Sequence, residues 1–277
     1  MTAARRVKSS LARPPRARFP VPELLELEAA DVPARWTERT VSWYERADLR
    51  GDYAERVLAV SADVLGDATS VLDVGAGFGA LALPLARRVA RVTALEPMPV
   101  MAAALRRALR RHTVTNVTVI EGSWPEAPVA AHDVVFCAQV GGLLTRGSPF
   151  LAEVMRVATR GVVLVRDTPD RDDKFFYGEL YPRLLGRPYM RTCEDGDTVA
   201  GLADLGIVPA VTAIEYRSDQ PFDSLDEACD FWMTYMGLAE EGARRFLHEF
   251  LGERLQRDGD GWLAPFTKRA DVIRWRV

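Results

Sequence analysis

Three glycines and two carboxylates stand at spacings that favour a ligand-binding site. Residues 71–74 read as a short buried strand, and Gly75, Gly77 and Gly79 then turn the chain into a helix. The start of such a helix presents free backbone N–H groups to polar ligand atoms. Glu96 ends the next apolar run, where its carboxylate can accept hydrogen bonds from both hydroxyls of a ribose. Together these residues predict a site for an adenosine-containing cofactor.

The residue two positions before the first glycine distinguishes between such cofactors. The segment Gly75-x-Gly77-x-x-Ala80 also satisfies the loose dinucleotide fingerprint. A dinucleotide brings an anionic pyrophosphate to this turn, and the carboxylate of Asp73 would repel it. S-Adenosylmethionine carries no phosphate, and Asp73 can hold its ammonium group directly or through water. Asp73 therefore favours S-adenosylmethionine over two alternatives, which are a nicotinamide or flavin site and a tight turn that binds no ligand.

At these residues the chain resembles the class I S-adenosylmethionine-dependent methyltransferases. Asp73-x-Gly75-x-Gly77-x-Gly79 matches their glycine-rich motif, and Glu96 matches their ribose-binding acid. The resemblance covers residues 60–165 well and residues 200–277 in outline. It implies an α/β fold with a Rossmann-like sheet of seven mostly parallel strands, the last inserted antiparallel, and it implies methyl transfer as the activity.

The composition is that of an ordinary globular protein. Of the 277 residues, 48% are hydrophobic and 27% are charged. No apolar stretch approaches the roughly 18 residues of a membrane span, and the N-terminus lacks the apolar core of a signal peptide. Three cysteines, Cys137, Cys193 and Cys229, lie far apart, which predicts a reducing, cytoplasmic setting. With only three histidines, no histidine-rich metal site is expected.

The first 22 residues differ from the rest of the chain. They hold six basic residues, four prolines and no acid. Because the whole chain has a net charge of −3, residues 23–277 carry −9. We predict a disordered basic leader at 1–22, with contact to nucleic acid or an acidic partner as the alternative. A helical cap is predicted at 23–66, and a cofactor-binding domain at 67–277 with substrate-side insertions at 166–200 and 222–258, the latter helical.

Strands and helices alternate through the predicted domain, as in a parallel sheet covered on both faces. The cap residues 35–65 read as helices broken near 49–52. The predicted strands cover residues 70–74, 91–96, 116–121, 132–138, 161–165, 207–216 and 271–275. The predicted helices cover residues 80–89, 99–111, 150–158 and 199–205, with two more within 224–257.

Further cofactor contacts are expected where the parallel strands end, because ligands bind at that edge of such a sheet. In the resembling family an acid often follows the glycine after strand three and accepts the adenine amino group. Here Ser123 follows Gly122, so Ser123, Glu121 or backbone atoms would make this contact. Trp124 is either an aromatic wall for the purine or a core residue. The predicted cofactor set is completed by Ala76, Pro97, Met98, Met101 and Ala138. The two methionines pack on the other face of the adenine or, as the alternative, have a purely structural role.

The acceptor side is less well defined by the sequence. Strand four ends in Ala138-Gln139-Val140-Gly141, not in the Asn/Asp-Pro-Pro-Tyr motif of enzymes that methylate nucleic-acid bases. This absence and the acidic body favour a small-molecule acceptor, with no nucleic-acid or membrane partner. Aromatic faces stabilise a sulfonium by about 2 kcal/mol when dry. The candidates for an aromatic lining are Trp36, Trp43, Tyr44, Phe175, Phe176 and Tyr177.

Tyr44, Gln139 and Tyr177 are the predicted catalytic residues, and they would act mainly by positioning. No cysteine–histidine pair or metal cluster indicates a general base. Two alternatives keep the same cofactor. In one, the amine of the methionine arm attacks its own γ-carbon, which gives azetidine-2-carboxylate and methylthioadenosine. In the other, the chain is a non-catalytic S-adenosylmethionine-binding subunit.

Overall fold

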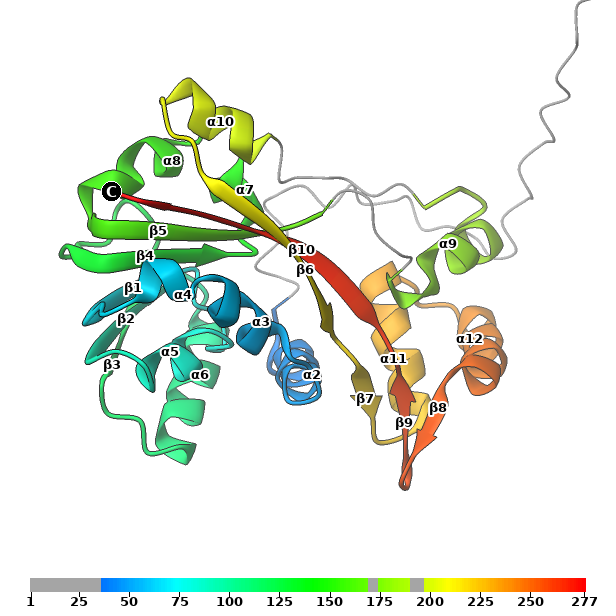
Figure 1. The fold of residues 1–277 in the computed structure, drawn as a ribbon. Helices are drawn as coiled ribbons and strands as arrows, with labels where there is room; N and C mark the ends of the chain where they lie inside the picture. Colours follow the sequence, from blue (N-terminus) through cyan, green and yellow to red (C-terminus); the bar gives the residue numbers. More distant parts are fainter. Residues whose placement is uncertain (1–35, 169–173, 190–196) are drawn as a thin grey trace, which may run out of the picture.

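The computed structural model describes residues 36–168, 174–189 and 197–277, which form two sheets with helices around them (Figure 1). The predicted leader and the cap residues before Trp36 lie outside the described residues, as does part of the predicted 166–200 insertion. The position of Cys193 is also outside them.

The main sheet has seven strands in the order β3-β2-β1-β4-β5-β10-β6. Neighbours among β1 to β5 pair in parallel, and β10 pairs antiparallel with both β5 and β6. The strands are β1 Ser70–Val74, β2 Arg91–Glu96, β3 Val117–Glu121, β4 His132–Ala138, β5 Ala158–Asp167, β6 Ala210–Arg217 and β10 Thr267–Arg276. The predicted seven-stranded, mostly parallel sheet with an antiparallel insertion is confirmed.

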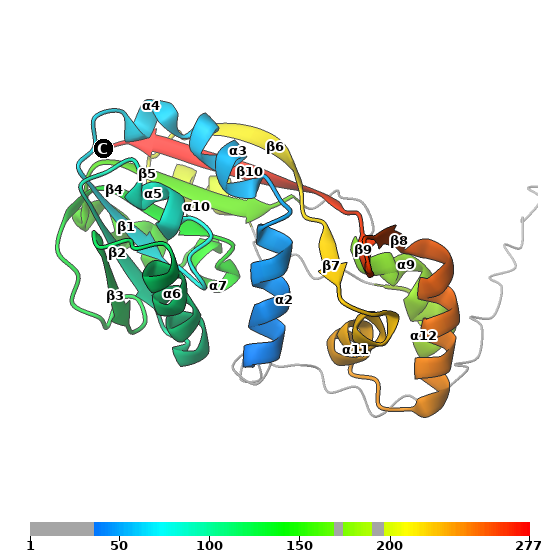
Figure 2. The same cartoon turned by 90° about the horizontal axis from the view of Figure 1, so that it is seen from below.

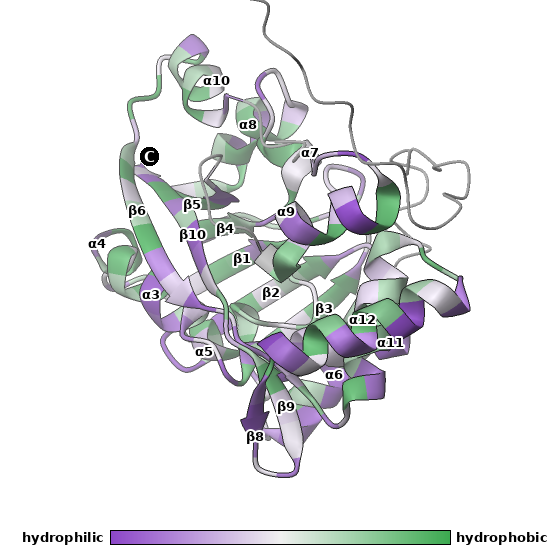
Figure 3. Cartoon of the chain, turned by 90° about the vertical axis from the view of Figure 1, so that its right-hand side faces the viewer, coloured by the Kyte–Doolittle hydropathy of each residue, from purple (hydrophilic) through white to green (hydrophobic). Residues whose placement is uncertain are grey.

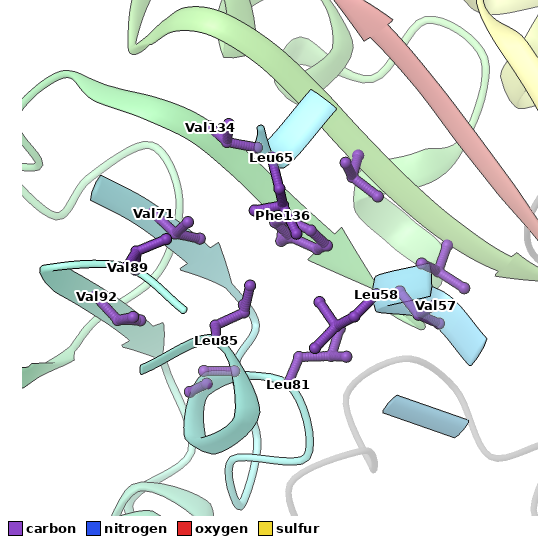
Figure 4. Close-up of a cluster of buried hydrophobic side chains, with 14 of the residues drawn as sticks. Val57, Leu58, Leu65, Val71, Leu81, Leu85, Val89, Val92, Val134 and Phe136 are labelled. Atoms are coloured by element: carbon purple, nitrogen blue, oxygen red, sulfur yellow. The ribbon is translucent and has the colours of Figure 1, made fainter. Parts of the chain in front are cut away.

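Hydrophobic residues cover both faces of this sheet, as expected for buried parallel strands. All five residues of β1 are buried, and they alternate between the two faces. On one face, Val71 and Phe136 belong to a cluster with Leu58 and Leu85 from the covering helices, which Figure 4 shows in close-up. On the other face, a second cluster includes Leu72 of the same strand. The sheet is therefore a central layer between two apolar cores.

Short helices form the two outer layers. Residues of α3 Tyr53–Val60, α4 Ala62–Leu65, α5 Ala82–Ala86 and α6 Pro99–Arg111 join the cluster that contains Val71. Residues of α7 Gly141–Leu144, α8 Pro149–Glu153 and α10 Thr198–Asp204 join the cluster that contains Leu72. Pro99 stands in the first turn of α6, where a missing N–H costs nothing.

Two helices are shorter than the sequence predicts. The turn after β1 has positive φ at Gly75, Gly77 and Gly79, so α5 begins only at Ala82 and ends at Ala86. The helix predicted at 150–158 begins at Pro149 behind an N-cap, Ser148, and ends at Glu153. A single turn of 3-10 helix follows, and Ala158 already belongs to β5. The predicted start and end of α5 and the predicted end of α8 were wrong, because turn geometry and not apolar periodicity decides where these short helices begin and end.

A second unit lies beside the main sheet and is built on a small antiparallel sheet of order β7-β9-β8. Figures 1 and 2 show that β6 leads into β7, and that β9 leads into β10, as one long ribbon. Aromatic side chains fill the core of this unit, and hydrophilic β8 lies at its edge (Figure 3). Its elements are β7 Gln220–Phe222, β8 Gln256–Asp258, β9 Gly261–Ala264, α9 Tyr177–Leu180, a π-helix Tyr181–Leu185, α11 Leu225–Met236 and α12 Glu241–Arg254. The sequence analysis predicted α11 and α12 but not this sheet.

Helix α2, Glu38–Asp48, contacts both units (Figure 2). Its buried Val41 packs with Met101 of α6 in the main domain. Trp43 is fully buried on the other side, where its indole N–H donates to Glu227 of α11 at 3.0 Å. Gln220 of β7 donates to the carbonyl oxygen of Trp43 at 3.1 Å. Trp43 is therefore a core residue that fastens α2 to the second unit, and it does not line a pocket as the sequence analysis allowed.

Candidate functional site

The turn after β1 is held against β2 and leaves an opening in front of it. The backbone N–H groups of Gly75 and Ala76 donate to the Leu95 carbonyl at 2.8 and 3.1 Å. Gly75 has φ +74°, and a Cβ there would lie 2.3 Å from a methyl of Val140. Gly77 has φ +57°, yet a Cβ there would meet no atom within 4 Å. The first glycine is thus required by packing within the protein, and the second faces space that a ligand can occupy.

Glu96 is the last residue of β2 and is bound to this turn. Its side chain is buried, with one oxygen accepting the Gly77 N–H at 2.8 Å and the other accepting the Met98 N–H at 2.8 Å. Burial raises the pKa of Glu96, and the two backbone N–H groups act in the opposite direction. Each oxygen keeps a lone pair for a further donor. The carboxylate is therefore fixed in orientation beside the glycine turn, and its contact with a ribose diol stays a prediction.

Asp73 presents an acceptor to which no donor in the described part of the chain bonds. The residue is only 2% exposed, and among the described residues its buried Oδ2 has no hydrogen-bond partner. Burial, with a smaller effect from Glu96, raises the pKa of Asp73 to about 7. A buried polar atom without a partner is rare and calls for an explanation. An ammonium group would supply both the hydrogen bond and the charge, so this observation fits S-adenosylmethionine.

The residues predicted around the adenine follow the ends of β2 and β3 in the chain. Met98 and Met101 pack in a cluster that also contains Trp36, Phe78 and Val41. Pro97 and Ser123 are exposed, and Gly122 is close to Ala127, with 2.9 Å to a Cβ built on the glycine. The ring of Trp124 packs edge-on against Phe150, with centroids 5.4 Å apart, and its indole N–H has no partner. The role of each in adenine binding stays a prediction.

Gln139 lies next to the glycine turn, since the following residue, Val140, packs against Gly75, and its backbone is strained. It follows Ala138 at the end of β4 and has φ +61°, which is uncommon for a residue with a side chain. Its backbone N–H donates to the Val165 carbonyl of β5 at 2.8 Å, which holds the strained turn in place. Such strain persists only where the surroundings enforce it, and it is frequent at functional sites.

The two predicted catalytic tyrosines belong to one continuous group of aromatic rings. Tyr44 of α2 contacts Trp36 and Tyr235, with centroids 5.1 and 6.5 Å apart. Tyr177 contacts Phe175 at 5.7 Å, and Phe175 stacks on Tyr235 at 6.3 Å. The tyrosines are therefore linked through Tyr235 and Phe175, across the boundary between α2 and the second unit. The structure does not test their catalytic role.

The sheet edge also carries polar groups that the sequence analysis did not include. Residues two apart in a strand share a face, so Asp167 at the end of β5 lies on the same face as Asp73. Tyr53 and Tyr216 reach that face, and their ring centroids are 4.9 Å apart. The predicted strand stopped at 165, and two more residues would have brought Asp167 to this edge. Tyr53 is recognisable in the sequence only as a large residue of the cap.

The sheet order, the glycine turn and the two buried carboxylates define a Rossmann-like nucleoside-binding enzyme domain. A family model described as a methyltransferase domain matches residues 71–161, which run from β1 into β5. Residues 71–161 of the chain therefore carry a methyltransferase domain, and the seven-stranded sheet around them has the class I fold.

Solved structures with similar folds have low sequence identity to the chain. Precorrin-8w decarboxylase of Methanobacterium thermoautotrophicum is 18% identical, over 80% of this chain and 90% of that one, with a TM-score of 0.49. A putative methyltransferase of Bacillus halodurans is 17% identical, over 80% and 97%, with a TM-score of 0.49. A methyltransferase of Aquifex aeolicus is 22% identical, over 65% and 92%, with a TM-score of 0.46. No curated protein sequence matches the chain.

Two further findings concern only the residues that the structure describes. Among residues 36–168, 174–189 and 197–277, no three acidic, histidine or cysteine side chains gather as a metal site would require. None of the helices in these ranges has the length and apolar character needed to span a bilayer.

Proposed function

We propose that this enzyme transfers the methyl group of S-adenosylmethionine to a small-molecule acceptor bound between the cofactor edge and the second unit. The observation that supports this most directly is the pair of buried carboxylates. Glu96 is oriented for a ribose, and Asp73 has an acceptor without a donor. A pyrophosphate would meet two negative charges here, whereas the amino-acid end of S-adenosylmethionine brings an ammonium.

A small acceptor is favoured by what covers the carboxyl edge of the sheet. Helix α2 contacts the main domain through Val41 and the second unit through Trp43. Arg46 of α2 also forms an ion pair with Glu227, so the cap and the second unit are joined by charge as well as packing. The net charge of −9 beyond residue 22 disfavours a long nucleic-acid interface. A cytoplasmic location is part of this proposal, and the buried free thiols of Cys137 and Cys229 are compatible with it.

We assign residues 67–277 to the catalytic domain, residues 23–66 to the cap and residues 1–22 to a leader. Within the domain, the cofactor supplies a sulfonium methyl that is already electrophilic. The protein then has to hold the nucleoside at Glu96, the ammonium at Asp73 and the acceptor in line with the methyl group. In this proposal Gln139, next to the glycine turn, orients the acceptor by hydrogen bonding.

The test is product analysis after incubation with S-adenosylmethionine, with and without pools of candidate small-molecule acceptors. We expect S-adenosylhomocysteine that depends on the acceptor, with the mass of the acceptor raised by one methylene. Glu96→Ala should abolish this signal at limiting cofactor, and Glu215→Ala should not, because Glu215 is an exposed residue of β6 paired with Arg269. Methylthioadenosine formed at catalytic rates without any acceptor would instead establish the intramolecular cyclisation. Tight cofactor binding without any turnover would indicate a non-catalytic subunit.

A further inference from the structure

Tyr53 is held firmly between the cap and the main sheet. It is the first residue of α3, and the preceding residue, Asp52, accepts the backbone N–H of Arg217 in β6 at 2.7 Å. Asp52 also accepts the Arg56 guanidinium at 3.0 Å, which secures the start of the helix. The Tyr53 ring packs on Tyr216 with centroids 4.9 Å apart. The position of the phenol is thus fixed by contacts that involve the backbone of β6.

The hydroxyl of Tyr53 is buried and has no hydrogen-bond partner. Burial raises its pKa well above the usual value, and Tyr216, Asp73 and Asp167 raise it further. The Gln139 side chain approaches closely enough to lower this pKa, although the two groups do not meet the geometry of a hydrogen bond. The hydroxyl therefore remains protonated at neutral pH. Among the described residues it is a buried donor that no acceptor meets at hydrogen-bond geometry, with the Gln139 side chain as a polar neighbour.

Across the same face lies the unpartnered oxygen of Asp73. The two groups are near enough for the charge on Asp73 to act on Tyr53, yet they are not bonded to each other. An occupant that satisfies both must offer a donor to Asp73 and an acceptor to Tyr53. A zwitterionic amino acid does this, because its ammonium and carboxylate stand on one carbon. The amino-acid group as a whole has no net charge, so Asp167 repels it less than it would repel a lone anion.

We propose that the Tyr53 hydroxyl donates a hydrogen bond to the α-carboxylate of the methionine portion of S-adenosylmethionine, while Asp73 holds the adjacent ammonium. This rests on the proposed function, since it assigns a second residue to the same cofactor. Tyr53 is then a positioning residue. It fixes the outer end of the cofactor and so sets the direction in which the sulfonium methyl points. Because Tyr53 belongs to the cap, the assignment also makes cofactor affinity depend on the docking of α3 against β6.

The experiment compares three nucleosides by titration calorimetry. S-Adenosylhomocysteine carries both the ammonium and the carboxylate, its decarboxylated analogue carries only the amine, and methylthioadenosine carries neither. Tyr53→Phe should weaken S-adenosylhomocysteine binding about tenfold or more, as for a hydrogen bond to a charged group. It should change binding of the other two by less than about twofold. The matched control is Tyr181→Phe in the second unit, which should change none of the three affinities.

Two results with the Tyr53→Phe variant would overturn the assignment. One is equal weakening of S-adenosylhomocysteine and its decarboxylated analogue by Tyr53→Phe, which would indicate a general effect on the fold. The other is no weakening of either. A third measurement needs no variant, because the unmodified protein should prefer S-adenosylhomocysteine over its decarboxylated analogue by about tenfold, and equal affinities would refute the proposal. Failure of the proposed function is distinct, because it appears in the product assay: the protein would still bind S-adenosylhomocysteine in this Tyr53-dependent way, yet it would form no S-adenosylhomocysteine that depends on an acceptor.

Discussion

Replacing Asp73 by Asn should stabilise the ligand-free protein at alkaline pH while removing its affinity for the cofactor. The native pKa of Asp73 is about 7, against 3.8 for the ordinary side chain. An acid whose pKa is raised by folding does not lower the free energy of unfolding below its unfolded pKa, and it lowers that free energy in full above its folded pKa. The difference between the two pKa values of Asp73 corresponds to about 4 kcal/mol of lost stability above pH 7. The buried amide of Asn would itself lack a partner and cost about 1–3 kcal/mol. The net gain at high pH is therefore expected to be about 1–3 kcal/mol.

The assay is thermal unfolding of the ligand-free protein and of Asp73→Asn across pH. A gain of this size corresponds to an increase of several degrees in melting temperature at about pH 8.5. The advantage should shrink by about 2 kcal/mol at about pH 5.5, where native Asp73 is protonated. S-Adenosylhomocysteine should raise the melting temperature of the unmodified protein and leave that of the variant nearly unchanged. A variant that is less stable by the same amount at every pH would refute the reasoning, because the native carboxyl would then be well solvated or hydrogen-bonded.

Four further predictions concern other parts of the chain. Glu96→Ala should weaken S-adenosylhomocysteine binding about ten- to one-hundredfold by calorimetry, and an effect as small as that of Glu215→Ala would exclude a ribose contact. The Gln139→Gly variant should unfold at the same or a higher temperature, because glycine relieves about 1 kcal/mol of strain at φ +61°. The variant enzyme should nevertheless turn over more slowly, and unchanged turnover would remove Gln139 from the site. Deletion of residues 1–22 should leave melting temperature and cofactor affinity unchanged, and a loss of either would show that the leader docks on the domain. Hydrogen exchange in α2 should slow when cofactor binds, and Tyr44→Ala should lower turnover more than melting temperature; a variant that mainly unfolds would make Tyr44 a core residue.

The cofactor half of the fold could be predicted because its signals are local. The β1 strand is wholly buried, and three of its five residues, Val71, Leu72 and Val74, are apolar and aliphatic, which marks a buried strand in the sequence. The glycines that follow have positive φ, a requirement that the residue type itself reveals. Glu96 stands at the end of the neighbouring strand, where the topology of parallel strands brings it to the same edge. Each inference needed only the spacing of residues and the rules of parallel sheets.

The acceptor half could not be predicted in the same way because its contacts are long-range. Tyr53 reaches the sheet only because Asp52 bonds to Arg217, a residue 165 positions away. Trp43 reads as a candidate pocket residue, and only its hydrogen bond to Glu227 shows that it is core. The small second sheet is built from strands of three or four residues, too short for alternation to be recognised. Where packing between distant segments decides whether a side chain lies in the core or in the site, residue type alone does not distinguish the two.

The ribbon that joins the two sheets has a topological consequence. Where β6 and β10 leave the main sheet, the Ser218 N–H donates to the Phe266 carbonyl at 2.8 Å. The chain between these residues leaves and returns through adjacent antiparallel strands, so residues 219–265 are an insertion into a single hairpin. Lengthening or shortening such an insertion does not alter the register of β10 on β6, or any residue of the glycine turn. Evolution or engineering can therefore exchange residues 219–265 as one piece while the cofactor half keeps its geometry. The helices at 177–185, which complete the second unit, lie outside this insertion and would stay in place.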